Sequence, residues 1–103
     1  MKLHEDNRRK LEDFPEGKLI TAKEDCVVGN HYHKIKIEIF VLSSGECKFI
    51  KEDVRTGQAF EFDLEIGELI TCYPYEYHEF HLKKGSVLVG LCSHLYDPND
   101  EIK

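Results

Sequence analysis

Two histidines and a glutamate within one short stretch carry the clearest chemical signal in this sequence. A single residue separates His31 from His33, and Glu38 follows them. Residues i and i+2 of a β-strand face the same side of a sheet, so both imidazoles would point the same way. Glu38 has the opposite parity on an unbroken strand and joins them only if residues 34–36 turn the chain. Two imidazoles and a carboxylate that converge form a ligand set for borderline divalent metals.

A second group of chemically informative residues lies further along the chain. Gly67, Pro74 and His78 follow one another in the order of a strand, a proline turn and a histidine that opens another strand. His81 lies at odd spacing from His78, so it is expected on the opposite face, at the surface or at an interface. A His-x-His pair alone also fits the solvated end of a strand, so the metal interpretation depends on whether this second group meets the first.

Short β-segments separated by turns must position these side chains. Period-two alternation, as in residues 60–64, and β-branched or aromatic enrichment predict strands. The predicted strands are residues 18–22, 26–33, 37–43, 46–52, 59–65, 69–73, 78–83 and 86–92. This spacing is typical of an all-β barrel of two antiparallel sheets. We expect no helix longer than two turns beyond residue 18.

Size and charge limit the classes of function. A chain of 103 residues with 41% hydrophobic residues has room for one core. Its 20 acidic and 14 basic side chains give a net charge of −6, which disfavours binding to nucleic acid. The sequence has no apolar run of membrane-spanning length, and its first residues are charged, unlike a secretory signal. We therefore expect a cytoplasmic protein with no nucleic-acid or membrane partner.

The domain organisation predicted from composition is simple. Residues 1–17 are strongly polar and are expected to form a loose arm or a strand lent to a neighbouring chain. Residues 18–95 form the domain, and residues 96–103 form an acidic tail. No C-x-x-C motif links any of the four cysteines, so we expect unpaired thiols on strands. The cysteines are Cys26, Cys47, Cys72 and Cys92.

The two histidine groups resemble the two motifs of the cupin superfamily. The spacing His31-x-His33-x4-Glu38-x6-Gly45 fits the first motif from its histidines onward. The step from Gly67 to His78 fits the second motif, with Pro74 one position late and Leu82 in place of a closing asparagine. The resemblance covers roughly residues 18–95 and implies a jelly-roll β-barrel.

The resemblance also implies a metal centre. Carried onto this sequence, the cupin ligands are His31, His33, Glu38 and His78. The bound group would be one divalent ion, and these ligand types leave open whether it is zinc, iron, nickel or manganese.

Within the cupins, the sequence looks like the small proteins of nucleotide-sugar metabolism. The segments that carry this likeness are His31-Tyr32-His33-Lys34, Pro74-Tyr75-Glu76-Tyr77-His78 and Leu95-Tyr96-Asp97-Pro98. This likeness implies an isomerase or epimerase that moves a proton beside the ketone of a keto-sugar nucleotide. His31 and His78 would be the catalytic histidines, and the metal would polarise the carbonyl. Such isomerases often carry an arginine just before the histidine pair, where this sequence has residues 27–30 without one.

Four further residues are candidates for substrate contacts. Tyr73, Tyr75 and Tyr77 could line a pocket mouth and stack on a base or sugar, or they could pack in the core. Lys34 could bind an anionic group, or lie solvated in a turn. Two other functions stay open: a redox cupin such as a dioxygenase, and a non-catalytic module that binds a small molecule.

One strand also predicts an assembly. If Glu38 faces the interior, the opposite face of the same strand carries Ile37, Ile39 and Val41. Leaving such an apolar stripe in water is unfavourable by roughly 25 cal/mol per Å². A second copy of the sheet would cover it, and two-fold dimers are the commonest assemblies. The sequence therefore predicts a homodimer.

Overall fold

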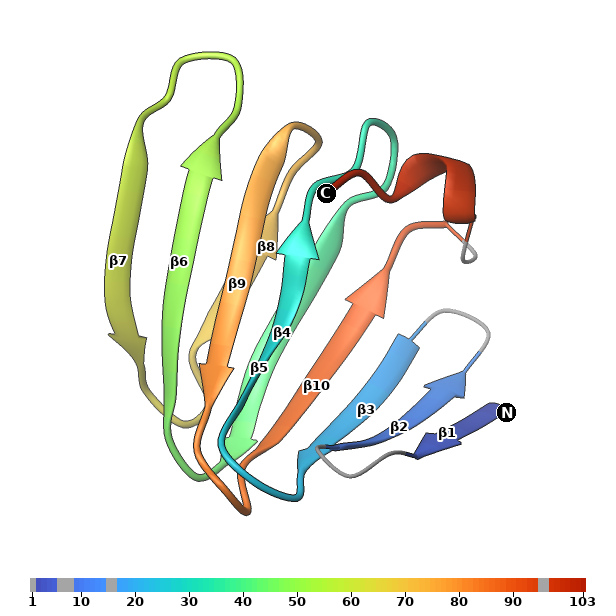
Figure 1. The fold of residues 1–103 in the computed structure, drawn as a ribbon, viewed down its shortest axis with the longest axis vertical. Coiled ribbons are helices and arrows are strands. Elements are labelled where there is room, and N and C mark those ends of the chain that lie inside the picture. Colours follow the sequence, from blue (N-terminus) through green and yellow to red (C-terminus); the bar gives the residue numbers. More distant parts are fainter. Residues whose placement is uncertain (1, 6–8, 15–16, 95–96) are drawn as a thin grey trace.

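A computed structural model describes residues 2–5, 9–14, 17–94 and 97–103 (Figure 1). Its strands from residue 17 onward match the predicted ones, with ends displaced by at most two residues, and two strands that were not predicted precede them. The strands are β1 (Lys2–Glu5), β2 (Arg9–Phe14), β3 (Gly17–Ala22), β4 (Cys26–His31), β5 (Glu38–Ser44), β6 (Cys47–Asp53), β7 (Ala59–Leu64), β8 (Leu69–Cys72), β9 (Glu76–Leu82) and β10 (Val87–Cys92).

The strands of the described residues form two antiparallel sheets that face each other. One has six strands in the order β1-β2-β3-β10-β5-β8, and the other has four in the order β4-β9-β6-β7. This is the all-β jelly-roll architecture that the sequence predicts. The helical structure in the described part of the chain is a 3₁₀ turn at Pro98–Asp100, and no helix there is long and apolar enough to span a membrane.

The N-terminal segment differs from the loose arm or lent strand that its polarity suggests. In its described residues it adds two strands to the larger sheet of the same chain. β2 pairs with β3 from Arg9 opposite Ala22 to Phe14 opposite Gly17, and β1 pairs with β2. This pairing satisfies backbone groups that β3 would otherwise expose at the edge of the sheet. The composition missed these strands because charged residues outnumber apolar ones there.

The core lies between the two sheets and follows the period of two. On β5, Phe40 and Leu42 are buried, and on β9, Phe80 and Leu82 are buried. The rings of Phe40 and Phe80 have centroids 4.5 Å apart. As expected, no disulfide joins the four cysteines, all of which lie in the described residues, and two of them, Cys47 and Cys72, are buried. Apolar packing therefore fills the barrel beside the inward-facing polar residues of the same strands.

The central aromatic residue gives a test of this core. Phe49 is buried on β6 and packs against Phe80 and Phe62. Phe49→Ala should lower the free energy of unfolding by about 3–5 kcal/mol, because it leaves a cavity as well as removing buried apolar area. Phe60→Ala is the matched control, since Phe60 on the neighbouring strand is half-exposed. Chemical denaturation monitored by circular dichroism measures both, and equal losses would contradict this assignment of the core.

Candidate metal centre

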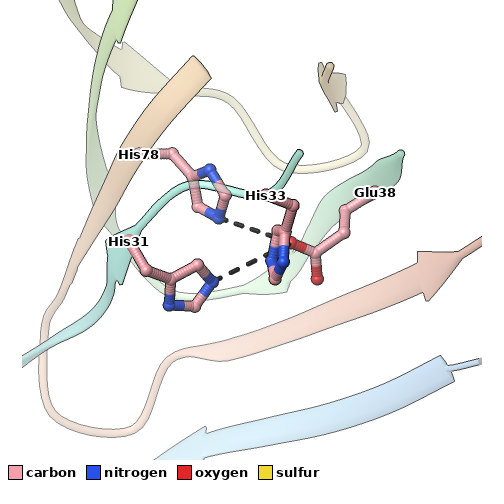
Figure 2. A group of neighbouring side chains, drawn as sticks. All are labelled: His31, His33, Glu38 and His78. Atoms are coloured by element: carbon pink, nitrogen blue, oxygen red, sulfur yellow. Dashed lines mark ion pairs between the residues drawn. The ribbon is translucent and has the colours of Figure 1, made fainter. Parts of the chain in front are cut away.

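The structure brings His31, His33, Glu38 and His78 together at one end of the barrel interior (Figure 2). His31 ends β4, Glu38 begins β5, and His78 lies in β9. Each residue can offer one ligand atom, and these atoms lie within 4.8 Å of one another. All four side chains are buried. Ligands held about 2.1 Å from a shared ion lie up to about 4.2 Å apart, so a small inward movement brings this set within reach of one ion.

An irregularity in β4 places His31. Gly29 and Asn30 have φ values of 94° and 57°, in the left-handed region, and the pairing with β9 shifts register between Gly29 and His31. His31 consequently lies opposite His78. A Cβ on residue 29 would come within 2.7 Å of the His78 carbonyl oxygen, so glycine is required there. The rings of His31 and His78 meet edge to face, with centroids 4.8 Å apart.

The turn that Glu38 needs lies between His33 and β5. Residues 34 and 35 form a bend, and β5 begins at Glu38. The chain therefore leaves one sheet and enters the other, and Glu38 comes to face the histidines. This change of sheet explains how Glu38 faces the same interior as His31 and His33, although on one unbroken strand it would point to the opposite side.

Glu38 lies at the centre of the charges in the cluster. Its Oε1 is 2.9 Å from His33 Nε2 and 3.4 Å from His78 Nε2, and its Oε2 is 3.0 Å from Lys18 Nζ. Burial would raise the pKa of the Glu38 carboxyl, but the adjacent imidazoles of His33 and His78 and the Lys18 ammonium hold it well below its ordinary range. Glu38 is therefore a carboxylate at neutral pH. Lys18 gave no sequence signal as a site residue.

The inward atoms of the cluster lack hydrogen-bond partners among the described residues. These atoms are the Nε2 nitrogens of His31, His33 and His78 and both carboxylate oxygens of Glu38. The close approaches to Glu38 do not have hydrogen-bond geometry. Glu38 Oε2 has the Lys18 ammonium as an ion-pair partner at 3.0 Å, so the three Nε2 nitrogens and Oε1 are the atoms left to a divalent cation. Buried polar atoms without partners are unfavourable, and such a cation would satisfy these four at once. The donor set therefore fits zinc, iron, nickel or manganese.

The outward nitrogens of the three imidazoles each face an oxygen acceptor. His33 Nδ1 lies 2.7 Å from the Asp100 carbonyl oxygen, and His78 Nδ1 lies 3.0 Å from that of Glu76. His31 Nδ1 lies 3.0 Å from Glu101 Oε1, close enough for an ion pair although not in hydrogen-bond geometry. Acceptors at Nδ1 favour the tautomer whose Nε2 lone pair is free. Sequence reasoning missed Asp100 and Glu101 because their acidic run resembles a solvated tail.

The candidate substrate residues do not converge on the cluster. Lys34 and Tyr73 are exposed. Tyr77 lies on the outer face of β9, where its hydroxyl donates to Glu79, and burial together with this hydrogen bond raises the pKa of Tyr77 to about 12. Its hydroxyl therefore stays protonated at neutral pH and does not supply a phenolate base. His81 shares that face and pairs with Glu79, as its parity predicted.

Tyr75 is the tyrosine linked most directly to the histidine segment. Its φ is 66°, and its backbone N–H donates to the His33 carbonyl oxygen. The guanidinium of Arg55 lies 5.1 Å from the centre of the Tyr75 ring. Arg55 and Tyr75 therefore place a cation and an aromatic face near the turn after His33.

A separate hollow lies at the open side of the barrel, with a volume of about 200 Å³. It lies among β6, β7 and β8 and includes Phe49, Phe60 and Leu69 in its lining. None of the four cluster residues lines it. It is therefore not the entrance to the candidate metal centre.

Comparison with known proteins identifies relatives of the whole fold. Residues 19–103 match the family model described as FdtA: WxcM-like, C-terminal. No curated protein matches the chain. The comparisons therefore consist of this family and of solved structures.

Solved structures of several enzymes and assembly proteins share the architecture. The capsular polysaccharide assembling protein CapF from Staphylococcus aureus has a TM-score of 0.83 and 20% identity, over 98% of this chain and 30% of CapF. A double mutant of the QdtA 3,4-ketoisomerase from Thermoanaerobacterium thermosaccharolyticum, in complex with TDP, has a TM-score of 0.74 and 25% identity, over 87% of this chain and 66% of QdtA. An oxalate decarboxylase variant from B. subtilis has a TM-score of 0.81 and 15% identity, over 99% of this chain and 30% of that one. This chain thus spans about a third of CapF.

The buried imidazoles predict how stability depends on pH. Burial, together with the nearby imidazoles of His78 and His33, lowers the pKa of His31 to about 3 from 6.5. Between these values the unfolded chain binds a proton that the folded chain resists, so the free energy of unfolding falls as pH is lowered. Glu38 acts in the same direction at lower pH, because its depressed pKa contributes stability that is lost on protonation.

Thermal unfolding of chelator-treated protein between pH 7.5 and pH 4 measures this effect. The melting temperature should fall steadily as the pH is lowered. His31→Gln should give a smaller fall than the wild type over the range from pH 6.5 to pH 4. Parallel profiles for the two proteins would contradict the assignment of His31 as a buried neutral imidazole.

Proposed function

Since the chain belongs to the FdtA: WxcM-like, C-terminal family and has the cupin fold, we propose that it is a metal-binding isomerase or epimerase. Its substrate would be a keto-sugar linked to a nucleotide. The observation that carries this proposal is the buried cluster of three imidazoles and one carboxylate, whose inward atoms lack partners. The solved QdtA structure with TDP supports the nucleotide part of the substrate.

In the proposed reaction, His31, His33, Glu38 and His78 hold the ion. An ion held there would supply Lewis acidity, which would polarise the carbonyl of a substrate and favour loss of the proton from the neighbouring carbon. Glu38 contributes the anionic ligand, and Lys18 keeps its second oxygen occupied. The imidazoles remain oriented by the acceptors at their Nδ1 atoms.

His31 and His78 are the proposed catalytic histidines, and the metal limits how they can act. The low pKa of His31 keeps its imidazole neutral at pH 7, with an Nε2 lone pair that is only a weak proton acceptor. An Nε2 that binds an ion has no lone pair left for a proton. His31 and His78 can therefore be bases only in a metal-free site, and activity with and without chelator distinguishes the two mechanisms.

The substrate contacts are proposed to lie outside the cluster. Tyr75, with Arg55 against its ring, is proposed to receive a sugar or base, and Lys34 is exposed in the bend after His33, whose carbonyl oxygen accepts from the Tyr75 N–H. Tyr73 and Tyr77 complete the proposed set. The chain lacks the arginine that similar isomerases carry before the histidine pair, so the diphosphate would need cations from these other positions.

A non-catalytic binding cupin is the second candidate. The burial of all four cluster residues favours it, because a site closed to solvent admits a metal more readily than a sugar. Turnover distinguishes this candidate from the isomerase.

The reaction itself is tested by proton exchange. The zinc-, iron-, nickel- or manganese-loaded protein is incubated in D₂O with TDP-4-keto-6-deoxyglucose and followed by proton NMR. We expect loss of the signal of the proton beside the ketone, since isomerisation and epimerisation both exchange it with solvent. Binding in a thermal-shift assay without exchange would favour the binding module. Oxygen uptake by the iron form would favour a dioxygenase.

Metal binding is tested independently of turnover. His33→Ala should lose the bound divalent ion, and the stabilisation that the added ion gives to the wild type should disappear. His81→Ala is the matched control, because His81 lies on the outer face of β9 and pairs there with Glu79. Elemental analysis of the purified proteins and thermal unfolding with added zinc measure both effects. Stoichiometric metal in His33→Ala would show that the ion binds elsewhere.

We also propose that the chain is a homodimer formed through the outer face of the larger sheet. Ile39 on β5 lies opposite Leu91 on β10, and Val41 lies opposite Leu69 on β8. Ile39 is 38% exposed, while Leu91 and Leu69 are more than half exposed. These side chains extend the apolar stripe of one strand into a patch across three strands.

The assembly is tested by substitution within this patch. Ile39→Lys should convert the dimer to monomer, because a buried ammonium at the interface is unfavourable. Ile66→Lys is the control, since Ile66 is exposed in the turn between β7 and β8. Sedimentation equilibrium at micromolar concentration gives the masses. A wild-type mass of 12.0 kDa would exclude the dimer.

A further inference from the structure

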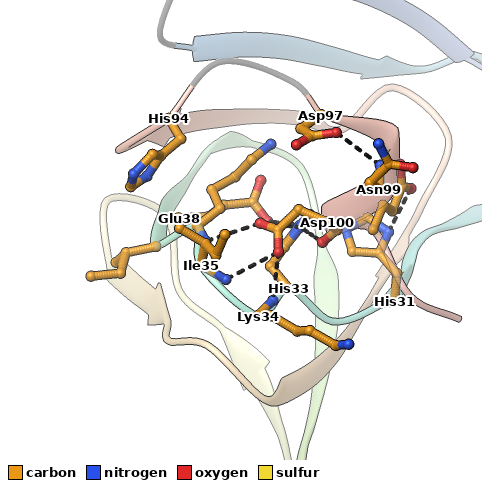
Figure 3. A network of polar contacts seen from close by, with 12 residues as sticks. His31, His33, Lys34, Ile35, Glu38, His94, Asp97, Asn99 and Asp100 are labelled. Carbon is orange, nitrogen blue, oxygen red and sulfur yellow. Dashed lines mark hydrogen bonds and ion pairs between the residues drawn. The ribbon is translucent and has the colours of Figure 1, made fainter.

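The segment after β10 returns to the candidate metal centre. Asp97 accepts a hydrogen bond from the Asn99 backbone at the start of the 3₁₀ turn, and the turn ends at Asp100. Figure 3 shows this turn against the loop that leads from His33 toward Glu38. Tyr32 and Ile102 exchange two backbone hydrogen bonds, of 2.8 and 2.9 Å. The segment from Asp97 to Ile102 is thus capped by its own Asp97 before Asp100 and held to Tyr32 after it.

Asp100 is a buried carboxylate whose partners are consecutive amides of that loop. Its Oδ1 accepts from the N–H groups of Lys34 and Ile35 at 2.8 and 3.1 Å. Its Oδ2 accepts from the N–H of Lys36 at 3.1 Å. Successive amides of a strand point in opposite directions, so three of them can meet one carboxylate only where the chain turns. Asp100 therefore stabilises the turn that brings Glu38 to the histidines.

The same residue contacts a candidate ligand directly. The carbonyl oxygen of Asp100 lies 2.7 Å from His33 Nδ1, and on the other side of that ring Nε2 lies 2.9 Å from Glu38. An Nδ1–H that donates to this carbonyl leaves the Nε2 lone pair directed into the cluster. The next residue, Glu101, places a carboxylate oxygen 3.0 Å from His31 Nδ1. Two adjacent residues thus face two of the three imidazoles from behind.

We propose that Asp100 is a positioning residue of the metal centre, with Glu101 supporting it, and that the segment 97–102 is part of the site. The proposal rests on the metal-binding function proposed above. Asp100 acts through the 34–36 turn and the His33 tautomer, and Glu101 acts through His31. The simpler alternative is that the segment only covers the end of the barrel, in which case its substitution would change stability and leave the ligands unaffected.

The test compares two aspartates of the same segment. Asp100→Asn replaces one acceptor oxygen with an amide donor, which opposes the loop N–H groups. Asp97→Asn makes the same change of charge, and asparagine caps a turn as well as aspartate does. Zinc affinity is measured by competition with a chromophoric chelator, and the absorption spectrum of the cobalt form reports ligand geometry. We expect a loss of affinity of about 10–100-fold and an altered cobalt spectrum for Asp100→Asn, with neither change for Asp97→Asn.

A measurement on the metal-free protein separates this proposal from the metal function. Long-range proton–nitrogen NMR of the imidazoles should show His33 as the Nδ1–H tautomer in the wild type and a mixture in Asp100→Asn. The substitution keeps the backbone carbonyl that faces Nδ1, but it weakens the side-chain contacts to the 34–36 turn that hold this carbonyl against His33. If the wild type binds none of zinc, iron, nickel and manganese but this tautomer difference is found, the positioning role stands and the metal-binding function is excluded. If Asp100→Asn keeps both the wild-type tautomer and the wild-type zinc affinity, the proposal is wrong.

A second pair of variants covers the case in which Asp100→Asn fails to fold. Glu101→Ala removes the oxygen that faces His31 Nδ1, whereas Glu101→Gln keeps an oxygen at that position. Glu101 is only partly buried, so both proteins are expected to fold. The alanine variant should bind zinc several-fold more weakly than the wild type, and the glutamine variant should recover most of the affinity. Equal affinities for the alanine variant and the wild type would overturn the role of Glu101.

Discussion

The carboxylate of Glu38 is 1% exposed, and a charge so deeply buried requires compensating charge close by. The neighbouring residues of the site are arranged to supply it. Removing an anion from water costs several kcal/mol even after the protein relaxes. Lys18 on β3 supplies one cation at 3.0 Å, and the imidazoles of His33 and His78 approach the other oxygen. With a proton on Nδ1, these neutral imidazoles direct an Nε2 lone pair into the cluster and donate nothing to that oxygen, and burial opposes protonation of His31. A divalent cation bound by the same atoms would complete the compensation.

The apolar core and the polar cluster are built from the same strands. On β5, Glu38, Phe40 and Leu42 face inward in succession, and on β9, His78, Phe80 and Leu82 do so. The ring of His78 lies 6.0 Å from those of Phe40 and Phe80. Rigid aromatic packing therefore limits the movement of the ligands on one side. A chain that buried the cluster without this support would have no fixed geometry to offer an ion.

The strands and the facing of most site residues could be predicted from sequence, because a period of two determines which residues share a face. That argument placed His31 with His33 and put His81 outside. It could not place Glu38 without assuming a turn, since the carboxylate that stabilises the turn comes from Asp100, far along the chain. The period of two also could not predict the irregularity at Gly29 and Asn30, because a register shift depends on backbone contacts with β9. Strands β1 and β2 carry mostly charged residues, so their pairing follows from the free edge of β3 and leaves little trace in hydropathy.

The acidic segment after β10 illustrates why composition misjudges such elements. A run of charged residues usually indicates solvation, yet Asp100 is buried because three backbone N–H groups supply what water would otherwise provide. Those amides lie between His33 and Glu38. Asp100 therefore satisfies the N–H groups of this loop and, through the loop, orients the two ligands on either side of it. Lys18 joins the opposite side of the cluster through Glu38 Oε2 and leaves Oε1 toward the imidazoles. Strand β3 and the segment 97–102 therefore constrain the ligands from separate parts of the chain, and binding of an ion would stabilise both of these contacts along with the barrel.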